Sequence, residues 1–337
     1  MDKYMKYFAA LVLLLTISIA YSQQKGEQEM PQPSKRYALE FASFAETEEQ
    51  IDHIYYLAES IRQFGGKAKS SPIWLYLADY NNLDVVETAK RFKPLNVTVF
   101  LCSAPNDALK FYFAGKVFAA GKCEQQAESE ADMLVWLDDD TVLLEEPSAF
   151  LLEPGTSFAY RPVMHNRSGT LYGQPPNPFW KRIYEVLDIQ PESLFEMTTP
   201  ADNQKINAYF NAGLLVVRPG KGILRKWSED FQKLYNDSTL VQMCQDDVTN
   251  RIFLHQTALV GAVLNTISHD EMVELPDSYN YPLFFEQMFG ATREFGSIED
   301  ITTLRYDIYF RDPDPEWAEK LKGSADKVNW LKERLGK

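Results

Sequence analysis

Short apolar runs alternate with amphipathic segments through the first half of the chain. Four of these runs have the length of buried strands, and they cover residues 37–43, 73–78, 97–102 and 133–137. The segments between them repeat apolar residues at helical spacing and predict helices over 48–64, 83–92 and 107–131. Strands that alternate with helices in this way predict an α/β fold with a doubly wound, mostly parallel sheet.

The pattern is looser after residue 150. Strand-like runs follow at 158–163 and 214–217, and amphipathic segments predict helices over 178–187, 222–235 and 246–254. No repeat or low-complexity segment interrupts the chain, and no linker divides it. We therefore expect one domain over 37–322, followed by a C-terminal helix over 323–337.

The N-terminus has the pattern of a secretory signal. Lys3 and Lys6 precede an apolar stretch over 8–21, which ends in small residues before polar Gln23. We expect residues 1–22 to be a signal peptide and 23–36 to be a flexible stem, which places the domain outside the cytoplasm, in a lumen, a periplasm or the medium. The alternative is an uncleaved membrane anchor, and only in that case do we expect contact with a membrane.

Net charge and cysteine usage narrow the classes of partner. The formal net charge is −14, which disfavours nucleic acids and anionic membrane surfaces as ligands. A protein this acidic must gather positive charge locally to bind phosphates, from a metal ion or from a few Lys and Arg side chains. The three cysteines have no metal-ligand spacing and are best explained as small buried hydrophobic residues.

Three aspartates follow the apolar run 133–137 directly. In an open α/β sheet, ligands bind in the crevice beyond the carboxyl ends of the strands. Residues i and i+2 of a strand point to one side, so we expect Asp138 and Asp140 to face one point, while Asp139 faces away or caps the following turn. Two carboxylates aimed at one point suit Mg²⁺ or Mn²⁺. The simpler alternative is an acidic turn at the end of a strand.

Three segments, in order, carry a resemblance to one family. They are VWLDDDTVLL at 135–144, YFNAGLLVV at 209–217 and LPDSYNY at 275–281. Together they resemble the nucleotide-sugar glycosyltransferases of the GT-A fold, especially the glycogenin-like and galactosyltransferase-like retaining enzymes. The resemblance implies a GT-A fold with a mixed, mostly parallel sheet. It also implies a nucleotide half at 37–145 and an acceptor half at 146–322.

The same resemblance implies an activity and a set of site residues. The activity is sugar transfer from a nucleotide sugar, UDP rather than GDP, to a glycan or protein acceptor with retention of configuration. Asp138 and Asp140 correspond to the D-x-D pair that holds Mn²⁺ or Mg²⁺. The expected donor contacts are Asp79, Lys116, Asp138, Asn211, Ala212, Gly213 and Arg311. The simpler alternatives are a solvated lysine at Lys116 and a glycine needed only for packing at Gly213.

Two segments depart from the family pattern. Gln245, Asp246 and Asp247 stand where the family has a D-Q-D run, so we expect catalytic roles for them, although helix capping is the alternative. Arg305 stands where the family has a metal-binding histidine, and the lysine that should follow is absent. Arginine has no lone pair for a metal. Asp307 is the possible replacement ligand, and Arg305 or Arg311 suits a diphosphate.

Other functions compatible with these departures are a non-catalytic carbohydrate- or nucleotide-binding protein on the same scaffold and a metal-dependent nucleotide-sugar hydrolase. A phosphatase of the haloacid dehalogenase type is set aside, because Thr141 follows Asp140 one position too early for its motif.

Overall fold

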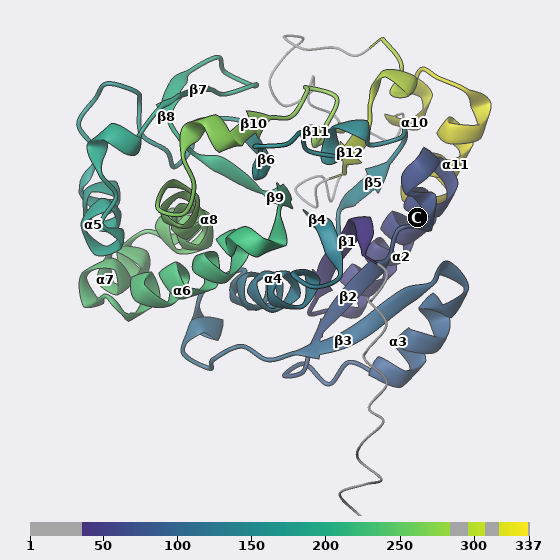
Figure 1. The fold of residues 1–337 in the computed structure, drawn as a ribbon, viewed down its shortest axis with the longest axis horizontal. Coiled ribbons are helices and arrows are strands. Elements are labelled where there is room, and N and C mark those ends of the chain that lie inside the picture. The colour runs from purple at the N-terminus through teal and green to yellow at the C-terminus, as the bar shows by residue number, and fades with distance from the viewer. Residues whose placement is uncertain (1–35, 284–295, 307–316, 336–337) are drawn as a thin grey trace, which may run out of the picture. The chain divides into compact units, whose positions relative to one another are not determined.

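A seven-stranded mixed sheet organises the chain (Figure 1). The computed structural model describes residues 36–283, 296–306 and 317–335. In spatial order the strands are β10 (Met272–Glu274), β6 (Phe158–Pro162), β9 (Phe210–Val217), β4 (Ala131–Leu137), β1 (Tyr37–Ala45), β2 (Ile73–Ala78) and β3 (Val97–Cys102). The expected mixed α/β architecture is therefore present.

One strand, β9, runs against the direction of its neighbours. It pairs antiparallel with β4 and with β6, whereas β1 pairs parallel with β2 and β4, and β2 pairs parallel with β3. The β4–β9 register sets Leu137 opposite Leu214. The start of β9 consequently lies beside the end of β4, where the three aspartates follow.

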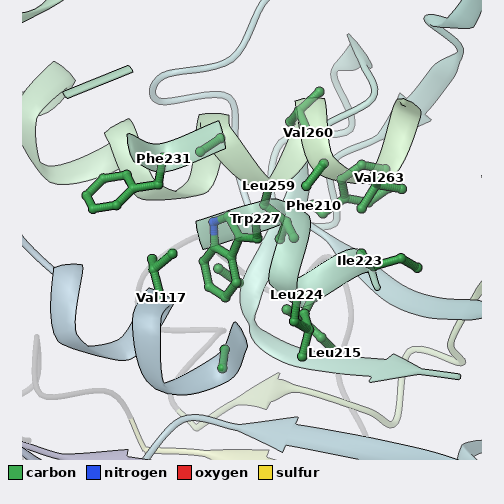
Figure 2. Packing of buried hydrophobic residues seen from close by; sticks show 14 of the residues in the cluster. Val117, Phe210, Leu215, Ile223, Leu224, Trp227, Phe231, Leu259, Val260 and Val263 are labelled. Atoms are coloured by element: carbon green, nitrogen blue, oxygen red, sulfur yellow. The ribbon is translucent and has the colours of Figure 1, made fainter. Parts of the chain in front are cut away.

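Side chains of the central strands alternate between two hydrophobic cores. Leu75 and Leu77 of β2 pack in one core, and Trp74 and Tyr76 pack in the other. This alternation is the period-two geometry of a strand that is covered on both faces. Helix α2 contributes to the first core, and α4, α6 and α8 contribute to the second. Figure 2 shows residues of α4, α6, α8 and β9 meeting around Trp227.

The helices lie largely where the sequence predicts them. They are α2 (Glu48–Phe64), α3 (Val85–Phe92), α4 (Ala114–Ala127), α5 (Pro178–Leu187), α6 (Ile223–Asn236), α7 (Ser238–Asp246), α8 (Val248–Leu264), α10 (Trp317–Lys320) and α11 (Ala325–Leu335). Local capping sets the start of α2, where Thr47 accepts a hydrogen bond from the Gln50 N–H, and of α5, where Asn177 accepts one from Trp180.

Two predicted helices are wrong in extent. The helix expected over 107–131 is confined to α4, because Phe113 adopts a left-handed conformation with φ of 63° that no α-helix can continue. The helix expected over 246–254 is divided, because Asp247 is extended and ends α7 before α8 begins.

Two smaller sheets complete the described structure. β5 (Thr141–Leu143) pairs antiparallel with β12 (Thr303–Arg305), which pairs with β11 (Tyr281–Pro282), and β7 (Glu196–Thr198) pairs with β8 (Lys205–Asn207). Pairing of β5 with β12 sets Arg305 opposite Thr141, directly after the aspartates.

Several expectations lie outside the described residues, namely the signal peptide at 1–22 and nearly all of the stem at 23–36. None of the helices in the described part of the chain combines the length and the apolar character that a membrane-crossing helix needs.

A glutamate is buried in the central strand. Glu40 of β1 is 0 % exposed, and neither of its carboxylate oxygens has a hydrogen-bond partner among the described residues. Burial, aided by the negative charge of Glu130, raises the pKa of Glu40 from 4.5 to about 9. The folded protein therefore keeps this proton at pH values where the unfolded chain has released it.

This proton makes stability depend on pH. The contribution of Glu40 to folding stability falls as the pH rises from about 4.5 towards 9, by a total on the order of 6 kcal/mol. In Glu40→Gln this loss is absent, so the variant should gain stability relative to the wild type as the pH rises. Denaturant unfolding between pH 5 and pH 9 measures the difference, with exposed Glu49→Gln as the control. A constant difference between Glu40→Gln and wild type would contradict the assignment.

Candidate active site

The acidic turn and the Asn211–Gly213 segment meet at one edge of the sheet. β4 ends at Leu137, and the antiparallel pairing places the start of β9 beside that end. The backbone N–H of Asp138 donates to the carbonyl of Gly213 at 2.9 Å. Two motifs that are 70 or more residues apart in the sequence therefore form one surface.

Gly213 has no side chain, and this lets two side-chain oxygen atoms lie close to its backbone. A Cβ atom at this position would lie 2.9 Å from Oδ2 of Asp138 and 3.0 Å from Oδ1 of Asn211. The same Asn211 oxygen accepts a hydrogen bond from the Gly213 N–H at 2.8 Å, which fixes the direction of the amide. The N–H of Ala212 donates to Oε1 of Gln256 on α8 at 3.3 Å and anchors the segment from behind.

Lys116 faces the acidic turn. Its Nζ lies 2.6 Å from Oδ1 of Asp138, and its side chain is only 9 % exposed. The alternative of a solvated surface lysine is therefore wrong. Burial raises the pKa of the Asp138 carboxyl above its usual range, while the positive charges of Lys116 and Arg305 act in the opposite direction. Lys116 thus partly offsets the cost of burying a carboxylate at this edge.

Asp139 lies on the same side as Asp138. Both line one pocket, and Oδ2 of Asp139 lies 3.2 Å from Nδ1 of His53 on α2. The hydroxyl of Tyr306 donates to the Asp139 carbonyl at 3.3 Å, and the Tyr306 ring meets the His53 ring edge-on. The expectation that Asp139 turns away from Asp138 is wrong, because strand geometry ends at Leu137 and the aspartates form a turn.

Asp140 faces a second cation. Its Oδ2 lies 3.7 Å from Nε of Arg305, and its carbonyl accepts a hydrogen bond from the Tyr306 N–H at 2.9 Å. Arg305, which stands where the resemblance implies a histidine, therefore pairs with Asp140 through opposite charge. Arg311 and Asp307, the other candidates from this segment, lie outside the described residues.

A pocket opens beside the first two aspartates. Its walls come from β1, α2, β4 and the start of α4, and they combine apolar side chains with Lys116 and three carboxylates. The lining residues are Ser43, Phe44, Glu46, Gln50, Phe113, Lys116, Trp136, Leu137, Asp138 and Asp139. Aromatic and aliphatic side chains beside converging polar groups are typical of a small-molecule site.

The other predicted residues have local contacts. Asp79 is exposed after β2, and its carboxylate accepts a hydrogen bond from the Ser103 hydroxyl. Gln245 is exposed at the end of α7, and Asp246 accepts a hydrogen bond from Gln242 at 2.8 Å. Asp247 caps α8 by accepting from the Thr249 N–H at 2.8 Å. Helix capping, the alternative for this run, is therefore present at Asp247, and the catalytic roles stay predictions.

Phe113 is a strained aromatic residue at the pocket. The left-handed region costs a residue with a Cβ about 1–2 kcal/mol, yet Phe113 adopts a φ of 63° directly before α4. Its side chain remains 43 % exposed. Nζ of Lys116 lies 5.5 Å from the ring centroid, and the ring of His255 lies at a centroid distance of 4.5 Å.

The oxygen atoms at this edge suit a small divalent cation. Asp138 and Asp140, in the turn after β4, supply two carboxylates. Within the described ranges, no three His, Cys, Asp or Glu side chains converge as a complete metal site. Mg²⁺ commonly binds through one or two carboxylates and takes its other ligands from water and substrate phosphates, so the residues fit such an ion.

Three residues at this edge escape prediction from the sequence. His53 lies on the expected helix 48–64, but nothing in the helical pattern indicates its contact with Asp139. Phe113 falls inside a segment predicted to be helical, and Gln256 lies within a buried helix that reads as core. Each of them reaches the site through tertiary packing.

Comparison with known proteins agrees with the fold. The bifunctional glycosyltransferase WbbM matches with a TM-score of 0.51 and 14% identity over 96% of this chain and 56% of that one. GlyE of Streptococcus pneumoniae matches with a TM-score of 0.44 and 15% identity, over 89% of this chain and 61% of GlyE. The galactosyltransferase LgtC matches with a TM-score of 0.45 and 12% identity, over 88% of this chain and 95% of LgtC. The chain thus spans less than two thirds of WbbM and GlyE. A sequence comparison with the curated proteins gives no match.

The fold class is that of the GT-A glycosyltransferases, as the sequence predicts. A family model described as the Rhodobacterales glycosyltransferase domain matches residues 49–265, which is more than half of the chain. The chain belongs to this family of glycosyltransferase domains.

The Lys116–Asp138 pair gives a stability test of the site. In Lys116→Met, Asp138 loses its nearest cation and remains beside Asp139, so we expect a loss of about 2 kcal/mol in unfolding free energy. This is below the loss for a fully buried pair, because Asp138 is 25 % exposed. Adding Asp138→Asn to this variant should restore most of the lost unfolding free energy. A double-mutant cycle measures the interaction energy between Lys116 and Asp138. Strict additivity of the two changes would show that the pair is not coupled.

Proposed function

We propose that the protein is a glycosyltransferase that moves a sugar from a nucleotide-sugar donor to a glycan or protein acceptor. The donor is a UDP-sugar rather than a GDP-sugar, and Mn²⁺ or Mg²⁺ takes part. The observation that carries the proposal is the meeting of the acidic turn, the Asn211–Gly213 segment and Lys116 at one edge of the sheet. Membership of a glycosyltransferase family supports the reaction class.

The proposed roles follow from chemistry and placement. Asp138 and Asp140 hold the metal ion, which when bound supplies Lewis-acid stabilisation of the departing nucleotide diphosphate. Lys116 exchanges part of its contact with Asp138 for a phosphate oxygen, adding positive charge that the acidic protein otherwise lacks. Arg305 suits a second phosphate contact, because its planar guanidinium can donate two parallel hydrogen bonds. Because Gly213 has no side chain, the Asp138 carboxylate and the Asn211 amide lie close together, and this pair contacts the donor sugar.

The acceptor side is proposed on weaker grounds. Gln245, Asp246 and Asp247 are exposed before α8, and the resemblance to retaining enzymes is the support for placing them at the reacting centre and for retention of configuration. Gln256 ties α8 to the donor side through Ala212. The proposed location is an exported or lumenal one, supported by the secretory pattern of the N-terminus.

A second candidate is a non-catalytic carbohydrate- or nucleotide-binding protein. Arg305 favours it, because the family's third metal ligand is replaced by a cation that faces Asp140. A metal-dependent nucleotide-sugar hydrolase is distinguished by its product, which is free sugar formed without any acceptor.

Calorimetric titration tests the donor site. We expect the purified protein to bind UDP more tightly than GDP, and only in the presence of Mn²⁺ or Mg²⁺. Asp138→Asn and Asp140→Asn should each weaken the metal-dependent binding at least about tenfold, because each removes a hard anionic ligand. Exposed Glu192→Gln is the matched control and should bind as the wild type does. UDP binding that is equally tight with and without metal would contradict the metal role.

A further inference from the structure

We propose that Phe113 is a stacking platform for a pyranose ring, which lies over its exposed face next to the acidic turn. The chemical class of the ligand is a hexose or pentose in its ring form. The sugar could belong to the donor or to the acceptor, and this part of the proposal rests on the proposed glycosyltransferase function.

The position of the ring is the first support. Phe113 lines the same pocket as Lys116 and Asp138, and the residue as a whole is 43 % exposed. Nζ of Lys116 lies 5.5 Å from the Phe113 ring centroid and 2.6 Å from Oδ1 of Asp138. The ring is therefore separated by one lysine from the carboxylate proposed to hold the metal ion. The donor sugar, or the acceptor sugar that attacks its anomeric carbon, is expected on this side of the pocket.

The fixed conformation of the turn is the second support. A bulky residue in the left-handed region persists only where its surroundings impose it, and such residues cluster at ligand sites. Here the His255 ring, itself 4 % exposed, lies behind Phe113 at a centroid distance of 4.5 Å. Arg251 of α8 donates to the Lys110 carbonyl from Nε at 3.0 Å and from Nη2 at 2.5 Å. The backbone before Phe113 is thus held to α8 while the ring faces the pocket.

The chemical character of the aromatic face of Phe113 is the third support for the proposal. An aromatic face carries partial negative charge and offers a flat apolar surface. A pyranose ring presents axial C–H groups on one side and hydroxyls around its rim. Stacking would cover the C–H groups with Phe113 while the rim hydroxyls reach polar neighbours such as Asp138 and Asn211. Burial, aided by the charge of Lys116, lowers the pKa of His255 well below its usual range, so the imidazole beside the Phe113 ring stays neutral.

Two substitutions separate stacking from folding. Phe113→Leu keeps an apolar side chain with the same backbone demand but removes the aromatic face, whereas Phe113→Tyr retains that face. Both proteins, with the wild type as full chains, are titrated with Mn²⁺ and UDP, then with UDP-glucose, UDP-galactose and UDP-N-acetylglucosamine. A parallel set of methyl glycosides is screened by saturation-transfer NMR. Thermal unfolding checks that both variants are folded.

We expect Phe113→Leu to bind UDP as the wild type does and a UDP-sugar roughly tenfold more weakly, if the stacked sugar is the donor's. If it is the acceptor's, donor affinities stay unchanged and the glycoside signals disappear. Phe113→Tyr should behave as the wild type in either case.

Three results would overturn the stacking role. One is equal binding of every saccharide by wild type and Phe113→Leu. Another is an equal loss of UDP and UDP-sugar affinity, which would place a nucleobase or a purely structural role at the ring. The third is a wild type that binds no saccharide probe. A different result would separate the two proposals. If the wild type binds no UDP but binds glycosides, and Phe113→Leu loses the glycosides, the proposed donor site is contradicted and the stacking role of Phe113 is supported.

Discussion

The antiparallel pairing of β9 with β4 is the constraint on which the candidate site depends. It joins the Asp138 N–H to the Gly213 carbonyl at 2.9 Å, so the acidic turn and the Asn211 amide belong to one rigid edge. A parallel β9 would place its first residues at the opposite end of the sheet. Lys116 then completes the edge from α4, because an acidic chain with a net charge of −14 needs a local cation wherever it receives a phosphate.

Much of the fold could be predicted from the pattern of apolar residues. The helix over 48–64 and the strands over 73–78 and 97–102 have the predicted bounds, because their apolar periodicity and their end signals agree. The prediction failed where tertiary contacts override local preference. The segment around Phe113 is helical by pattern, yet Arg251 holds the Lys110 carbonyl and the chain turns before α4. The family resemblance implies a mixed sheet, but the reversed direction of β9 was not predicted, since a buried strand looks alike in either direction.

The site was predictable only in its motifs. The sequence identifies Asp138 and Gly213 as parts of one site through resemblance, and the structure brings them together. It does not reveal that Asp139 lies in the pocket with His53 beside it, because strand alternation stops at the end of β4. The pairing of Arg305 with Asp140 is equally hidden, since it depends on the register between β12 and β5.

The central claim is that a nucleotide diphosphate and a divalent cation meet at the edge formed by β4, β9 and α4. Anomalous diffraction at the manganese absorption edge, from crystals grown with UDP and Mn²⁺, tests this most directly. The account predicts one strong peak bound by the carboxylates of Asp138 and Asp140, with the diphosphate beside Lys116. A manganese peak held by other acidic residues, or an ordered UDP molecule away from this edge, would contradict it.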